Sequence, residues 1–81
     1  MAMSPTILRV GPYRFFFFSR EEPRAHVHVH SPDGEAKFWL EPAGELAVNQ
    51  GLSDKSLAEA RKLVEENQEV FRDAWKRHFG S

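Results

Sequence analysis

The stretch AHVHVHSPDGEAKFWL, from Ala25 to Leu40, alternates apolar and polar side chains on both sides of a turn sequence. Alternation with a period of two residues is typical of a β-strand that buries one face. Between the two runs, Ser31–Gly34 holds the Pro, Asp and Gly that tight turns prefer. We therefore predict a β-hairpin with a four-residue loop at this point.

The four-residue loop also predicts the register of the two strands. It places the histidines on one face, in the pairs His26–Trp39, His28–Lys37 and His30–Glu35. It places the apolar side chains on the other face, in the pairs Ala25–Leu40, Val27–Phe38 and Val29–Ala36. A shift by one residue would turn one strand's apolar side chains to the polar face, so this register is favoured.

Two more strands are expected before the hairpin, Thr6–Val10 and Tyr13–Phe18, separated by the turn signal Gly11-Pro12. The second strand is aromatic on both faces, so it requires cover on both. We predict that Phe16 and Phe18 join the core beside the apolar hairpin face. The alternate side chains would then share the histidine face, namely Tyr13, Phe15, Phe17 and, from the hairpin, Trp39.

The rest of the chain indicates a connector and a helix. Residues 41–52 are interpreted as the connector, with room for one helical turn around Glu45–Asn49. Ser53 is a suitable N-cap, and apolar residues then recur with helical spacing as far as Phe79. We expect a helix over about residues 53–79, with a break allowed because that length is large for this domain.

Together these elements predict an α+β fold, with a three- or four-stranded antiparallel sheet and a C-terminal α-helix packed on one face. The 81 residues correspond to one domain, 1–81, with the sheet at about 6–40. The chain has no cysteine, which excludes disulfides and thiolate metal clusters.

The net charge of −1 argues against a protein that binds nucleic acid through its overall charge. A local basic patch remains an alternative, and it would be formed by Arg9, Arg14, Arg20 and Arg24. No apolar run approaches the ~20 residues of a membrane span, and no signal peptide is recognised. We expect a cytoplasmic protein that does not enter a membrane.

The alternating histidines allow two kinds of chemistry. As metal ligands, His26, His28 and His30 are the candidates for a divalent ion such as Zn²⁺, since imidazoles on alternate strand residues can converge on one ion. As acid–base catalysts of RNA cleavage, the candidates are His26, His28, Lys37 and Tyr13. Against both stands the alternative of a row of polar side chains on the wet face of a strand.

A third hypothesis needs no special geometry. Aromatic side chains are enriched at the centres of interfaces, and a small protein rarely exposes many of them without use. We therefore predict a protein partner or a homodimer on this face. The expected binding residues are Tyr13, Phe15, Phe17, His26, His28 and Trp39.

Several motifs together resemble one family of small bacterial proteins described as a domain of unknown function. They are PTILRVGPYRFFFFS, HVHV and GEAKFWLEP, and the resemblance extends from Pro5 to about Trp75. The chain departs from the pattern at Arg24-Ala25, where members often have prolines, and His30 is outside the motif. The resemblance implies genes that often stand in pairs that look like toxin–antitoxin modules, so a protein of this kind would be one component of such a pair.

Overall fold

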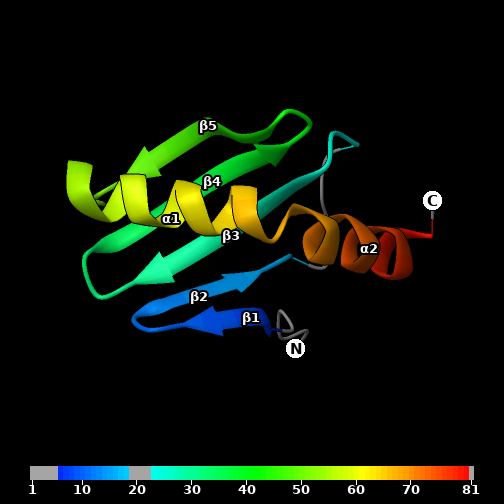
Figure 1. Ribbon diagram of the computed structural model, residues 1–81, viewed down its shortest axis with the longest axis horizontal. Helices are drawn as coiled ribbons and strands as arrows, with labels where there is room; N and C mark the ends of the chain where they lie inside the picture. Colours follow the sequence, from blue (N-terminus) through cyan, green and yellow to red (C-terminus); the bar gives the residue numbers. More distant parts are fainter. Residues whose placement is uncertain (1–5, 19–22, 81) are drawn as a thin grey trace.

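The computed structural model describes residues 6–18 and 23–80. Arg20, one residue of the expected basic patch, lies outside these ranges. The described chain forms five antiparallel strands in sequential order, followed by two helices (Figure 1). Their bounds are β1 Thr6–Val10, β2 Tyr13–Phe16, β3 His26–Ser31, β4 Gly34–Leu40, β5 Ala43–Gln50, α1 Asp54–Glu66 and α2 Gln68–Phe79.

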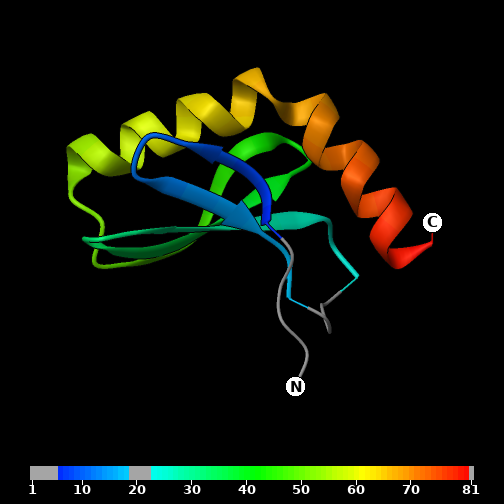
Figure 2. The ribbon, with the colours of Figure 1, turned by 90° about the horizontal axis from the view of Figure 1, so that it is seen from below.

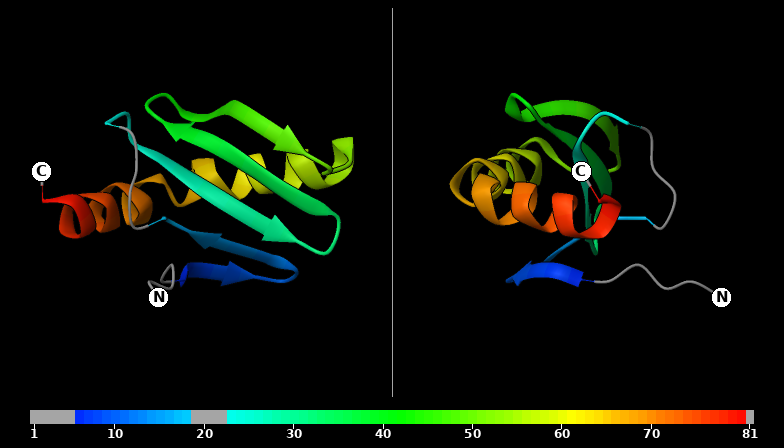
Figure 3. Two further views of the ribbon diagram at one scale, coloured as in Figure 1. Left: turned by 180° about the vertical axis from the view of Figure 1, so that it is seen from behind. Right: turned by 90° about the vertical axis from the view of Figure 1, so that its right-hand side faces the viewer.

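The molecule has two layers. Helix α1 lies over one face of the sheet, and α2 continues from it at an angle, at the end of the sheet (Figure 2). Seen from behind, the other face of the sheet stands in front of the helices (Figure 3). The core fills the space between the layers, and its fully buried side chains include Phe15, Phe17, Val27, Val29, Phe38, Leu40, Ala60, Val64 and Phe71. The predicted α+β class with an antiparallel sheet is confirmed.

The predicted register of the central hairpin is also confirmed. In the structure His26 pairs with Trp39, His28 with Lys37, and His30 with Glu35. Ser31 and Gly34 close the turn as a further pair. A Cβ on Gly34 would lie 2.3 Å from the carbonyl oxygen of Gln50, so only glycine lets the end of β5 pass this close.

The expected strand count was wrong, because the connector contains a fifth strand. Residues 43–50 form β5, and the helical turn expected at Glu45–Asn49 does not form. The pairing of β4 with β5 shifts between Lys37 and Phe38 and again between Trp39 and Leu40. These irregularities disturb the alternation that identifies a strand, and Gly44 adds a residue of low strand propensity.

The single expected helix is two helices. The N-cap is as predicted, with the Ser53 hydroxyl accepting from the Ser56 amide at 3.1 Å. At the other end, Gly80 ends α2 in a left-handed conformation. Between the helices, Asn67 has φ −115° and ψ 23°, and its side-chain amide donates to the Leu63 carbonyl at 2.8 Å. An asparagine competes with the helix backbone in this way, which accounts for the bend.

The expected facing of the phenylalanine run was also wrong. Phe15 pairs with Val29 and Phe16 pairs with His28, so Phe15 lies on the helix side of the sheet. Phe15 and Phe17 are completely buried, and Phe18 on the other side is 43% exposed. The helices supply the reason, because Phe15 packs on Phe71 and Phe17 packs on Trp75.

Arg72 joins α2 to the sheet. It donates to the carbonyl of Leu40 at 2.9 Å, at the end of β4. Across residues 6–18 and 23–80, neither helix is both long and apolar enough to cross a membrane.

Candidate binding surface on the open sheet face

The face of the sheet turned away from the helices is called the open face below. Cross-strand pairing places its side chains in rows, and the residues are Arg9, Arg14, Phe16, Phe18, His28, His30, Glu35, Lys37, Trp39, Glu45 and Val48. Arg24, just before β3, adjoins it by lying over the ring of Trp39. The surface is therefore built from all five strands.

The centre of the open face is an aromatic cluster. The rings of Phe16 and His28 are stacked, with centroids 5.5 Å apart and an interplanar angle of 22°. The ring of Phe18 meets His28 edge-on at 4.3 Å. Phe16 is nearly buried by these neighbours, so Phe18 and His28 present the cluster to the surroundings.

Cationic side chains cover the neighbouring rings. The guanidinium of Arg14 lies 4.6 Å from the centroid of Phe16. Trp39 has two cations, with Arg24 at 4.0 Å and the Lys37 ammonium at 4.7 Å. Such cation–π contacts hold a charge flat against the sheet while leaving it accessible to an anionic partner.

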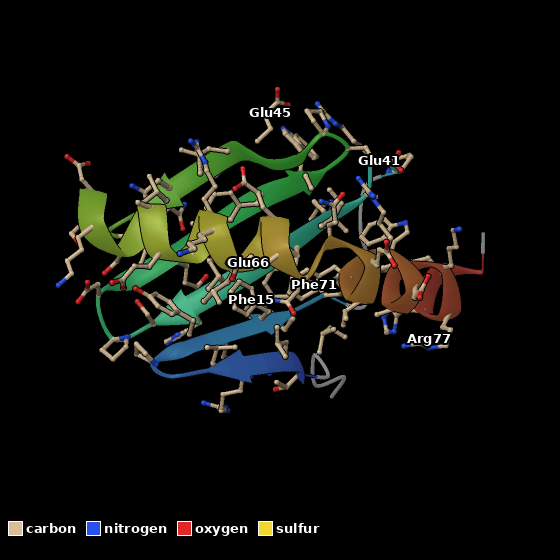
Figure 4. All side chains as sticks on the ribbon, viewed as in Figure 1. Phe15, Glu41, Glu45, Glu66, Phe71 and Arg77 are labelled. Atoms are coloured by element: carbon tan, nitrogen blue, oxygen red, sulfur yellow. The ribbon has the colours of Figure 1, made fainter. Side chains whose placement is uncertain are left out.

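Two carboxylates, those of Glu35 and Glu45, also belong to this face. Glu45 accepts from Arg24 at 2.7 Å, and about half of each side chain is exposed. In Figure 4, Glu45 points outward at the edge of the sheet. The pair is solvated and adds little stability, but it helps to fix Arg24 over Trp39.

His26 begins the histidine row but is completely buried. Its Nδ1–H donates to the carbonyl of Arg24 at 2.7 Å. The ring lies 5.1 Å from Trp75 of α2 and 5.8 Å from Trp39. These contacts make His26 a packing residue that fixes the entry to β3, so it offers no exposed atom to a substrate or partner.

Tyr13 lies on the helix side of the sheet, away from His28. Its hydroxyl donates to a carboxylate oxygen of Glu59 in α1 at 2.5 Å. Burial raises the pKa of the Tyr13 hydroxyl above its ordinary value of 10.0, and the hydrogen bond to Glu59 raises it further. Of the expected catalytic set, the open face therefore brings together only His28 and Lys37.

The expected binding residues are divided in the same way. Tyr13, Phe15 and Phe17 belong to the core, and the open face holds His28 and Trp39. Phe16 and Phe18 were expected in the core instead of on this face, and Arg24 was expected only as part of a possible basic patch. The sequence contains a signal that places Arg24 on this face. Arg24 stands two residues before His26, so it continues the same face of the strand.

A shallow hollow of about 320 Å³ opens beside the aromatic cluster. Its lining is Phe18, His28, Glu35, Ala36, Lys37, Val48 and Gln50. An imidazole, a carboxylate and an ammonium thus meet around one space. For the metal hypothesis, no three His, Asp or Glu side chains gather around a common point within residues 6–18 and 23–80.

Comparison with known proteins identifies a family but no individual relative. Searches of curated proteins and of solved structures gave no match. A family model described as "Domain of unknown function (DUF4160)" matches residues 13–76, which is most of the chain. The resemblance to a domain-of-unknown-function family is thus confirmed, and the chain belongs to the DUF4160 family.

Proposed function

We propose that this protein is an interaction module that binds an acidic surface of a protein partner with its open face. The observation that supports this most strongly is the set of three cation–π contacts, Arg14 on Phe16 and both Arg24 and Lys37 on Trp39. Arginine and aromatic side chains are the residues most enriched in interface centres and hot spots.

The charges of the open face favour an acidic partner. Its cationic side chains are Arg9, Arg14, Arg24 and Lys37, and its carboxylates are Glu35 and Glu45. Electrostatic complementarity raises association rates and rejects partners of like charge. The sequence's net charge of −1 hides this asymmetry, since the two helices hold six acidic and six basic residues, and the rest of the sequence holds Glu21, Glu22, Asp33 and Glu41 against Arg20.

The same charges favour a different protein over a second copy of the chain. In a two-fold dimer a surface patch meets itself, so cationic side chains would face one another. We therefore expect the isolated protein to sediment as a monomer at tens of micromolar. A dimer that persists at that concentration would replace the proposed partner by a second copy.

The gene pairing implied by the family resemblance provides the first partner to test. We propose that the product of the adjacent gene binds this face, as one half of a toxin–antitoxin-like pair. Co-expression with one tagged member should yield a complex at equal stoichiometry by size-exclusion chromatography. Separate elution of the two proteins would remove this partner, and growth of cells that express each gene alone tests toxicity.

A second candidate function is cleavage of RNA by acid–base chemistry. It is favoured by the hollow that His28, Glu35 and Lys37 line together. His28 or Glu35 would move the proton and Lys37 would hold the phosphate charge. Labelled RNA incubated with wild type and His28→Ala tests this: cleavage by wild type alone supports it, and equal cleavage or none contradicts it.

A further inference from the structure

The first strand of the sheet, β1, lies at an edge (Figure 1), and β2 is its only strand partner within residues 6–18 and 23–80. The later part of β1 pairs regularly with β2, in the pairs Leu8–Phe15, Arg9–Arg14 and Val10–Tyr13. A regular edge strand presents a row of backbone groups to which another strand can bond.

The turn between β1 and β2 determines which backbone groups of β1 face outward. Only Gly11 and Pro12 separate Val10 from Tyr13, so Val10 and Tyr13 form the pair that exchanges both backbone hydrogen bonds. In an antiparallel ladder such pairs alternate with pairs that exchange none, and Arg9 belongs to the second kind. The N–H and the C=O of Arg9 therefore point away from β2, toward the edge of the sheet.

The other edge strand, β5, is protected against pairing. Its register to β4 shifts twice, helix α1 packs against it, and it carries the charge of Glu45. Irregular pairing, a covering helix and charged side chains are the devices that prevent a further strand from adding to an edge. In β1 the register shifts only between Thr6 and Leu8, so the stretch that follows is regular.

The side chains beside this edge differ between the two faces of the sheet. Leu8 and Val10 lie on the helix side, since their partners Phe15 and Tyr13 are buried there. Val10 is 38% exposed and lines a largely apolar hollow of about 280 Å³ together with Leu63 of α1. The lining also includes the charged residues Glu59, Lys62 and Glu66. On the open face, the exposed side chain at the edge is that of Arg9.

We propose that β1 is a docking site for an extended segment of a protein partner, in which apolar and acidic side chains alternate. The backbone of Arg9 would bond the segment as an added strand, and apolar side chains would enter the hollow beside Val10. A carboxylate on the other face of the segment would pair with the guanidinium of Arg9.

A second copy of the chain fits this edge less well. A two-fold pairing of β1 centred on Arg9 would bring two guanidinium groups directly opposite each other, which is destabilising. The inference rests on the proposed function for the acidic character of the partner. Strand addition itself needs neither Arg24 nor Trp39.

The test is a titration of the protein with short synthetic peptides at constant ionic strength, with backbone amide shifts followed by NMR. One peptide alternates valine and glutamate, the second alternates valine and lysine, and the third has the valines and glutamates of the first in two blocks. Saturable shifts in residues 6–10 with the first peptide alone support the proposal. Absence of saturation, or equal binding of the lysine or block peptide, would overturn it.

A substitution at Arg9 separates the backbone contact from the charge. Arg9→Pro removes the outward N–H together with the guanidinium, whereas the matched control Arg9→Gln removes the guanidinium alone. Proline is tolerated in an edge strand where its nitrogen faces outward, so the variant should fold, and its amide spectrum checks this. Arg9→Pro should bind the alternating glutamate peptide at least tenfold more weakly than Arg9→Gln, as expected for a lost hydrogen bond. Equal affinity of the two variants would contradict strand addition.

Two further measurements separate this site from the open face and from self-association. The double variant Arg24→Glu and Lys37→Glu should bind the alternating glutamate peptide as wild type does, so the edge can be tested even if the open face binds no protein. Loss of peptide binding in that variant would place the peptide on the open face and overturn the proposal. A dimer in sedimentation whose β1 amides shift with protein concentration would also overturn it, in favour of a second copy.

Discussion

Phe15 of β2 packs on Phe71 of α2 (Figure 4), with 5.3 Å between the centroids of the two rings. This contact fixes which way the phenylalanine run faces. Because Phe15 points to the helices, its neighbour Phe16 must point to the open face, where it stacks on His28. The surface that we propose for binding follows from this one core contact.

Truncation of Phe15 should therefore be far more damaging than truncation of Phe18. Phe15→Ala empties a completely buried position and should reduce the free energy of unfolding by about 3–5 kcal/mol. Phe18→Ala, at a ring that is 43% exposed, should cost less than about 1 kcal/mol. Urea denaturation followed by tryptophan fluorescence measures both. Equal losses would contradict the facing of the run.

The sequence was sufficient for the β3–β4 register but not for the facing of β2. Valines and histidines alternate in β3, so only one register buries the valines. Arg14 is the one charged residue of Tyr13–Phe18, and the faces of that strand are distinguished only by what lies across from them. That information resides in Phe71 and Trp75, more than fifty residues later in the chain.

The missing strand and the helix break have local causes that a pattern does not reveal. Irregular pairing along β5 disturbs the period of two, so the segment resembled a connector. Asn67 is a polar residue within the apolar stripe of the predicted helix, four residues from Leu63 and from Phe71. Its bond to the Leu63 carbonyl, which accompanies the bend, became visible only in the structure.

Gly34 should be intolerant of any side chain. Gly34→Ala places a methyl group against the Gln50 carbonyl and should destabilise the protein by roughly 1–3 kcal/mol, as overpacking does. Gly11→Asn is the control, since no atom lies within 4 Å of a Cβ there and asparagine tolerates the left-handed backbone. Thermal unfolding by circular dichroism compares them. A wild-type midpoint for Gly34→Ala would contradict the close approach.

Substitution of His26 should destabilise the protein more than substitution of His30, although both residues belong to the alternating histidine row. His26→Ala removes a buried ring and its hydrogen bond to Arg24, at a cost of about 2–3 kcal/mol. His30→Ala, at an exposed position, should stay within about 0.5 kcal/mol of wild type. Chemical denaturation gives both values. If the two substitutions cost the same, His26 is not the packing residue described above.

Tyr13 allows a clean test by pH, because the chain has a single tyrosine. Its pKa in the folded protein is raised above 10.0, first by burial and then by Glu59. The folded state therefore holds this proton more tightly than the unfolded state. The resulting stability is complete below about pH 10 and is lost as the pH rises through the folded pKa.

Phenolate absorbance near 295 nm follows this titration directly. Glu59→Gln removes the carboxylate that accepts from Tyr13, so the midpoint should move down toward 10. Glu66→Gln, also exposed on α1, should leave the midpoint unchanged. An unshifted midpoint in Glu59→Gln would show that the carboxylate does not act on the phenol.

The central claim, that the open face binds an acidic protein, is tested most directly by reversing its charge. The double variant Arg24→Glu and Lys37→Glu changes the two cations on Trp39, and Arg61→Glu with Lys62→Glu makes the same change on the exposed helix surface. Affinity for the neighbouring gene's product is then measured by calorimetry. We predict that the first pair weakens binding at least a hundredfold, as hot-spot residues do, and that the second pair leaves it unchanged. Equal affinity of the two variants, or loss only in the helix variant, would contradict the account.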